Sequence, residues 1–171
     1  MRQFDSLSRR SLLAGAGAAL AIGLSGCSRA EPNRSATNSP QPAAGSGAMT
    51  VYRDPNCACC EAWARQAQQA GFAARLVDEP DMAALKRRLG VPEALASCHS
   101  ATLDGFVIEG HVPFDQIRRL LRERPDGTSG LAVPGMPTGS PGMETPDGQR
   151  EPYEIFAFGR DGSSRSYARV A

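Results

Sequence analysis

Three cysteines stand within four positions of this chain, at Cys57, Cys59 and Cys60. Thiolates act both as nucleophiles and as metal ligands, so the cluster admits thiol–disulfide exchange, metal binding or a structural disulfide. Cys57 and Cys60 form a Cys-x-x-Cys pair suited to exchange, but exchange has no use for a third sulfur at Cys59. A disulfide between Cys57 and Cys60 would close almost no loop, so a purely structural role is the weakest of the three interpretations.

Further donor side chains follow along the chain. Cys98 and His99 are adjacent, His111 comes later, and the Pro/Gly-rich stretch "AVPGMPTGSPGME" carries Met136 and Met143. Each donor also has a purely structural alternative. Cys98 could be a buried thiol, the histidines could lie at the surface, and the methionines could fill gaps in the core. Thiolate and thioether donors together select Cu(I), whereas structural zinc usually takes two separated pairs of Cys or His and gives no reason for the methionine loop. The inventory therefore favours copper.

The elements that must position these donors alternate between strands and helices. Residues 49–54 predict a strand that ends at the turn signal Asp54-Pro55-Asn56, so the cysteines fall in the first turn of the next helix, where the helix dipole favours thiolate. The further predictions are a helix over 59–71, a strand over 72–78, a helix over 81–90 with Asp81 as N-cap, a helical turn over 91–97, a hairpin over 101–112 around Asp104-Gly105, a helix over 113–124, a loop over 130–144, and strands over 153–158 and 166–171.

This order predicts an α/β fold, a thioredoxin-like sandwich with a central mixed β-sheet flanked by helices, over residues 49–171. Residues 1–26 instead have the basic start, short apolar core and small residues of an export signal. Within them "SRRSLL" resembles the twin-arginine signature, and "LSGC" resembles a bacterial lipobox in which Cys27 is acylated. Residues 27–48 are rich in Pro, Ser and Ala and lack apolar periodicity, which predicts a disordered tether.

The net charge of the chain and the compartment to which it is predicted to be exported limit the functions that it can have. Removal of residues 1–26 lowers the formal charge from +1 to −1, because three Arg and one Asp leave with them. The chain then has no electrostatic footprint for nucleic acid. In an oxidising compartment the four cysteines of the folded domain allow two disulfides, one disulfide with two thiols, or a metal cluster. We expect a periplasmic, membrane-attached lipoprotein that is exported by a twin-arginine or general secretion signal.

Four segments resemble one known family. "VYRDPNCACCEAWA", "LGVPEALASCHSA", "VIEGHVPFDQIRRLL" and "GLAVPGMPTGSPGME" are similar, in matching order over about residues 50–160, to small bacterial exported metal-binding proteins long classed as a domain of unknown function, which include the CopG-type copper-resistance proteins. Ala58 stands where the family more often has Gly, and Ser100 where it often has Thr. The resemblance implies a thioredoxin-like fold that binds copper through Cys57, Cys59, Cys60, Cys98, His99, His111, Met136 and Met143.

The sequence thus predicts a lipid-anchored copper-binding protein that holds Cu(I) and contributes to copper resistance, with copper ions and other periplasmic copper-handling proteins as partners. Cys57, Cys60 and Cys98 are the first ligands expected, and Cys59 is next. Two alternatives stay open. One is a thiol–disulfide oxidoreductase with Cys57 as nucleophile and Cys60 as resolving thiol; the other is copper redox cycling coupled to this cysteine pair.

Overall fold

The computed structural model describes residues 47–171. The predicted export signal, the lipidation site Cys27 and nearly all of the predicted tether lie outside the described residues. In the described part, no helix has the length and apolar character needed to cross a membrane.

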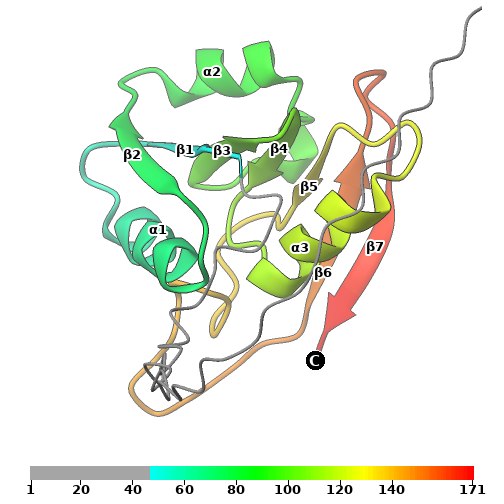
Figure 1. Cartoon of the computed structure of the whole chain (residues 1–171). Coiled ribbons are helices and arrows are strands. Elements are labelled where there is room, and N and C mark those ends of the chain that lie inside the picture. The colour runs from blue at the N-terminus through cyan, green and yellow to red at the C-terminus, as the bar shows by residue number, and fades with distance from the viewer. Residues whose placement is uncertain (1–46) are drawn as a thin grey trace, which may run out of the picture. The chain divides into compact units, whose positions relative to one another are not determined.

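A seven-stranded mixed sheet forms the centre of the fold, as Figure 1 shows. The strand order across the sheet is β2-β1-β3-β4-β5-β6-β7. The β1–β2 and β4–β5 pairs are parallel, and the other neighbouring strands are antiparallel. The strands are β1 (Met49–Arg53), β2 (Ala74–Asp78), β3 (His99–Leu103), β4 (Phe106–Glu109), β5 (Gly130–Ala132), β6 (Tyr153–Phe158) and β7 (Ser164–Val170).

Helices cover both faces of this sheet (Figure 1). The helices α1 (Ala58–Gln69) and α3 (Phe114–Glu123) pack on one face, where their buried residues join alternate residues of the strands in the larger core cluster. The other face carries α2 (Met82–Leu89) and the short 3-10 helix η1 (Glu93–Leu95), above a smaller apolar cluster. The predicted α/β sandwich of a mixed sheet flanked by helices is confirmed.

The helix boundaries follow the predicted capping residues. Asp81 accepts a hydrogen bond from the Ala84 N–H at 2.8 Å and begins α2, which ends at Gly90 in the left-handed conformation. The helix α3 ends at Glu123, and its C-cap residue Arg124 directly precedes Pro125, which cannot continue a helix. Local sequence signals therefore set both ends of α2 and the end of α3.

One element differs from the sequence prediction. Residues 130–144 were predicted to be a loop throughout, but Gly130–Ala132 form the short strand β5. This strand pairs with β4 on one side and with β6 on the other, so it joins the N-terminal strands and the C-terminal hairpin in one sheet. Three residues are too few to show the alternating pattern by which strands are predicted, and the pairing comes entirely from distant neighbours.

Candidate metal centre

The cysteine cluster begins α1, directly after the turn that follows β1. Cys57 is the N-cap residue, and its Sγ accepts a hydrogen bond from the Cys60 N–H at 3.3 Å. The Asp54 carboxylate accepts from the Asn56 N–H at 2.8 Å, and the Arg53 guanidinium donates to the carbonyl oxygen of Cys57 at 3.3 Å. The turn is therefore fixed by local hydrogen bonds, and it holds the three sulfurs at a helix N-terminus.

Cys57 and Cys60 form a disulfide, while Cys59 and Cys98 are free thiols. This is the arrangement of one disulfide with two thiols among the three that the cysteine count allows. Cys60 is fully buried, whereas Cys57 and Cys59 are partly exposed. In this state only Cys59 and Cys98, among the cysteines of the described residues, are free to lose a proton and bind a metal. The sequence predicted Cys57, Cys60 and Cys98 as the first ligands, with Cys59 next.

Strand pairing brings Cys98 to the cluster across a long stretch of sequence. In the antiparallel β1–β3 pair, Arg53 lies opposite His99, so the start of β3 lies beside the end of β1. The Sγ atoms of Cys59 and Cys98 are 3.8 Å apart, and those of Cys57 and Cys59 are 3.5 Å apart. Sulfurs at such distances are close enough to share one ion or neighbouring ions.

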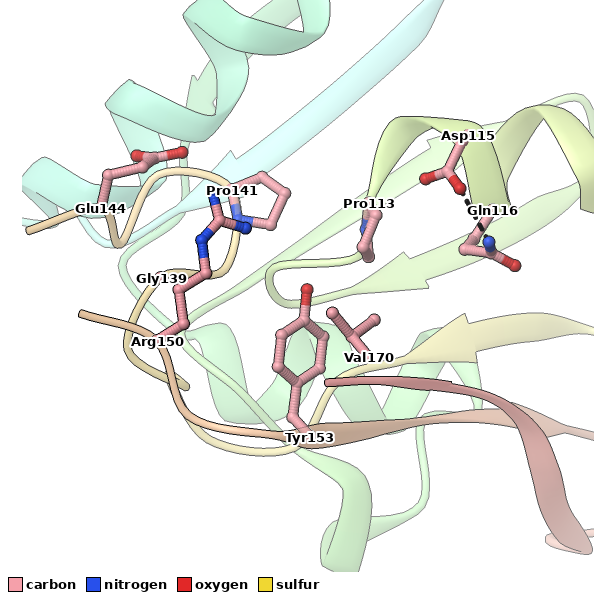
Figure 2. A pocket seen from close by; sticks show the side chains of 9 residues that line it. All are labelled: Pro113, Asp115, Gln116, Gly139, Pro141, Glu144, Arg150, Tyr153 and Val170. Atoms are coloured by element: carbon pink, nitrogen blue, oxygen red, sulfur yellow. Dashed lines mark hydrogen bonds between the residues drawn. The ribbon is translucent and has the colours of Figure 1, made fainter. Parts of the chain in front are cut away.

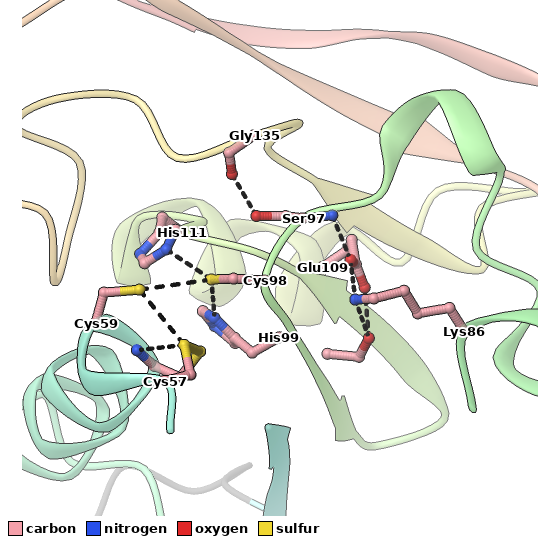
Figure 3. Close-up of polar contacts among 11 residues, drawn as sticks. Cys57, Cys59, Lys86, Ser97, Cys98, His99, Glu109, His111 and Gly135 are labelled. Atoms are coloured by element: carbon pink, nitrogen blue, oxygen red, sulfur yellow. Dashed lines mark hydrogen bonds and ion pairs between the residues drawn. A yellow bond between two sulfur atoms is a disulfide. The ribbon is translucent and has the colours of Figure 1, made fainter. Parts of the chain in front are cut away.

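Both histidines meet the Cys98 sulfur, as Figure 3 shows. Its Sγ lies 3.3 Å from Nδ1 of His99 and 3.0 Å from Nε2 of His111. Nδ1 of His111 lies 2.8 Å from the carbonyl oxygen of Pro141. A carbonyl only accepts, so Nδ1 carries the hydrogen of the neutral ring and the lone pair of Nε2 faces Cys98.

Two groups of donors therefore overlap at one residue. In the first group, Cys57, Cys59, Cys60 and Cys98 offer ligand atoms that all lie within 4.8 Å of one another. In the second group, Cys98, His99 and His111 meet the same limit. Cys98 belongs to both, so the sulfur-rich half and the nitrogen-containing half form one continuous cluster.

The Pro/Gly-rich loop approaches the cluster with one of its two methionines in contact. Sδ of Met136 lies 4.0 Å from Sγ of Cys59, and Met136 is 53% exposed. Met143 is partly buried in the same loop, where its main chain bonds to Ser140 and Gly139. A Cβ added at Gly142 would lie 2.9 Å from the Cys59 carbonyl oxygen, so only glycine lets this loop pack so closely on the start of α1.

Aromatic and apolar side chains close the inner side of the cluster. The Trp63 ring lies 4.7 Å from the His99 ring between centroids, and its Nε1–H donates to the carbonyl oxygen of Val112 at 3.2 Å. Trp63, His99 and His111 are all fully buried. Within the described part of the chain, Nε2 of His99 has no hydrogen-bond partner. A buried ring nitrogen without a partner is costly unless a ligand satisfies it.

Burial keeps the donors neutral in the absence of a cation. It lowers the pKa of His99 well below 6.5, an effect to which the nearby His111 and Lys86 add. Burial likewise lowers the pKa of His111. It also raises the pKa of Cys98 to about 12, with the neighbouring Cys59 as the next cause. A bound metal cation would replace the Cys98 proton, and neutral imidazole is the form that binds metals.

This donor set favours copper over harder ions. Thiolates, a thioether and imidazoles are soft or intermediate donors, which Cu(I) prefers over carboxylate and water. The donor atoms that converge are the sulfurs of Cys59 and Cys98, Nδ1 of His99 and Nε2 of His111. The residues that would hold copper are Cys59, Cys98, His99, His111 and Met136, joined by Cys57 and Cys60 when their disulfide is reduced.

Three polar residues behind the cluster are not among those that the sequence predicts for the site. Glu109 is fully buried at the end of β4, where it meets Lys86 of α2 and Ser100 of β3. Two signals were available: Glu109 interrupts the apolar strand "FVIE", and Lys86 is the only lysine in the chain. Neither signal by itself indicates that the two side chains meet.

A shallow pocket lies beside the Pro141 end of the loop (Figure 2). It has a volume of about 340 Å³ and mixes the acids Asp115 and Glu144 with Arg150 and Tyr153. None of its lining residues is Cys, His or Met, so we assign no metal to it.

Comparisons with known proteins find a matching family and similar solved structures. A family model described as "Protein of unknown function, DUF411" matches residues 95–143. Two solved structures are similar to the chain, "Copper resistance protein copG- Form 1" and "Copper resistance protein copG- Form 2", with TM-scores of 0.67 and 0.68. They are 41% and 43% identical to it, and each match covers 72% of this chain and 96% or 98% of the other. No curated protein sequence matches.

The buried histidines predict that the metal-free protein loses stability in mild acid. Because the folded state lowers the pKa of both histidines, the unfolded chain binds more protons below pH 6.5. The stability that the neutral rings contribute is complete above pH 6.5 and is lost as the pH falls below it. We expect a loss of about 1 kcal/mol from His99 over the first pH unit below 6.5, and a smaller loss from His111, whose pKa is lowered less.

Urea unfolding at pH 7.5 and pH 5.5, in the presence of a chelator, measures this loss. The chain has only two histidines, so His99→Gln should make the pH dependence distinctly shallower. A free energy of unfolding that does not change between these pH values would contradict the neutral, buried state of the rings.

Proposed function

This chain belongs to the CopG-type copper-resistance family, and from that premise we propose that it binds Cu(I) through cysteine, histidine and methionine side chains and so contributes to copper resistance. The observation that carries the proposal is the Cys98 sulfur. It lies within 3.8 Å of the Cys59 sulfur and of one nitrogen from each histidine. A thiol at the centre of such a group is a bridging or shared ligand once a cation replaces its proton.

The exposed methionine gives the site an outer donor. Met136 is 53% exposed and contacts Cys59, while the histidines behind them are fully buried. Copper that arrives from solvent or from another periplasmic copper-handling protein would therefore meet the thioether first. Thioether ligands bind Cu(I) without a proton to displace, which suits a position of entry and release.

The disulfide favours a second candidate, copper redox cycling coupled to the cysteine pair. Two Cu(I) ions each give up one electron to become Cu(II), the S–S bond of Cys57–Cys60 breaks, and the two sulfurs take up two protons. The reverse step returns the disulfide and two Cu(I) ions. Simple thiol–disulfide exchange remains the third possibility, because Cys57 is partly exposed and Cys60 is fully buried, as a nucleophile and a resolving thiol require.

Reduction of the disulfide should strengthen copper binding, because it adds two thiolates to the donor set. Under anaerobic conditions, we expect the reduced chain to hold Cu(I) at least about tenfold more tightly than the oxidised chain in competition with a Cu(I) chelator. The variant with Cys57→Ser and Cys60→Ser should behave like the oxidised chain under both conditions. Equal affinity of the reduced and oxidised wild-type chains would remove this pair from the ligand set.

The same titration separates the redox candidate. New thiols that form as Cu(I) is added to the oxidised chain, together with a Cu(II) signal in electron paramagnetic resonance, would support electron transfer to the disulfide. Cu(I) binding without either signal would rule that step out.

The methionines distinguish copper binding from thiol exchange, because a thioether takes no part in disulfide chemistry. We expect Met136→Ala to weaken Cu(I) binding about tenfold, and the double variant with Met143→Ala to weaken it at least as much. Thiol–disulfide reductase activity and apo stability should not change. Met82→Ala in α2 is the matched control, since it removes a thioether from a helix on the other face of the sheet. Unchanged copper affinity in the double variant would contradict both thioether ligands.

We also propose that the protein is a lipoprotein held in the periplasm, because "LSGC" places Cys27 after small residues at the end of an apolar segment. Cys27→Ser should leave the precursor uncut or release the protein from the membrane fraction. Membrane fractionation and the mass of the mature chain measure this. A variant that is still processed and still membrane-bound would show that Cys27 is not the anchor.

A further inference from the structure

A buried carboxylate lies directly behind the cluster. We propose that Glu109 is a positioning residue, which holds the segments that carry Cys98, His99, Met136 and His111 in the arrangement that copper requires. The inference rests on the proposed copper-binding function and deepens it. Glu109 is fully buried at the last position of β4, and it makes three polar contacts (Figure 3).

Two of these contacts enclose the Cys98-His99 dipeptide. Oε1 of Glu109 accepts from the backbone N–H of Ser97 at 2.7 Å, and Oε2 accepts from Oγ of Ser100 at 2.5 Å. Ser97 precedes Cys98, and Ser100 follows His99. One rigid carboxylate thus fixes both ends of the dipeptide, which leaves its two side chains little freedom to move relative to the sheet.

The same carboxylate reaches the methionine loop through Ser97. Oγ of Ser97 donates to the carbonyl oxygen of Gly135, the residue before Met136, and Ser97 and Gly135 form an isolated β-bridge. A Cβ at Gly110 would lie 2.4 Å from Oγ of Ser97, so only glycine leaves room for Ser97 beside the end of β4. His111 follows directly after Gly110. Three ligand-bearing segments therefore meet around one side chain.

Lys86 of α2 contacts Glu109 on the face of the sheet that lies away from Trp63. Its Nζ forms an ion pair with Oε1 of Glu109 and donates to Oγ of Ser100 at 3.1 Å. The register places Ser100 opposite Glu109 in the β3–β4 pair, and both side chains point to the face that α2 covers. His99, between Ser97 and Ser100, points to the face where Trp63 lies.

Stability alone does not account for this arrangement. An ion pair buried from water gains little over well-packed apolar side chains, because desolvation of both charges offsets their attraction. The carboxylate of Glu109 instead provides directional hydrogen bonds, because its two oxygens accept from three donors at fixed angles. That is the requirement of a metal site, in which small displacements of a ligand weaken binding.

Glu109→Gln tests the proposal in the full chain. The amide keeps the shape of the side chain, but its NH₂ cannot accept from Ser100, and Lys86 loses its counter-charge. We expect Cu(I) affinity at least about tenfold lower by chelator competition. We also expect X-ray absorption of the copper-loaded protein to show fewer nitrogen and sulfur scatterers at the copper. Glu154→Gln, which removes a surface ion pair with Arg169, is the matched control and should change neither quantity.

Ser100→Ala keeps the proposal testable if Glu109→Gln does not fold. It removes one hydrogen bond to the carboxylate and keeps the Lys86–Glu109 pair, so the fold should persist. We expect a several-fold loss of Cu(I) affinity and a changed copper spectrum in this variant as well.

The possible outcomes distinguish the copper-binding proposal from the positioning role of Glu109. If the wild-type chain fails to bind Cu(I), the proposed function itself is wrong. If the wild-type chain binds Cu(I), and the folded variants lose apo stability but keep the wild-type affinity and copper spectrum, Glu109 has a structural role alone and the positioning role is overturned.

Discussion

The candidate site depends on the antiparallel pairing of β1 with β3. This register sets Arg53 opposite His99, so the turn that leads into Cys57 lies beside the start of β3, directly after Cys98. Side chains alternate between the faces of a strand, so a slip of one residue would turn His99 away from Trp63 and toward α2. The loop that carries Met136 packs against the first turn of α1 at Gly142.

The metal-free centre holds both histidines and Cys98 uncharged by burial. Two histidines are buried in their neutral form, and the thiol of Cys98 is held in its protonated form by burial and by its neighbour Cys59. The partnerless Nε2 of His99 adds an unmade hydrogen bond. The unmade hydrogen bond costs free energy in the metal-free protein, and the lowered pKa values of the two histidines add a cost below pH 6.5. Binding of a cation to these donors would therefore be coupled to the stability of the folded protein.

The disulfide between Cys57 and Cys60 lies at the helix N-terminus where the candidate metal ligands gather. A pair that can be oxidised changes the number of thiolates at the site without a change of fold, because the two residues belong to a single helical turn. Cys59 is placed between this pair and Cys98, within 4 Å of sulfurs on both sides. The third sulfur, which exchange does not need, is therefore the one that joins the motif to the rest of the cluster.

The sequence by itself determined the donor inventory and the local elements. Caps such as Asp81, the turn before Cys57 and the apolar period of α3 act over a few residues, so their structures were predictable from neighbours alone. The sequence also indicated copper, because the softness of sulfur donors is a property of residue type. The tertiary structure alone decided that β5 is a strand, that Met136 is the methionine in contact with Cys59, and that Lys86 meets Glu109 behind the site. These features arise from contacts between segments far apart in the chain, and such contacts depend on strand register and packing, which no local pattern records.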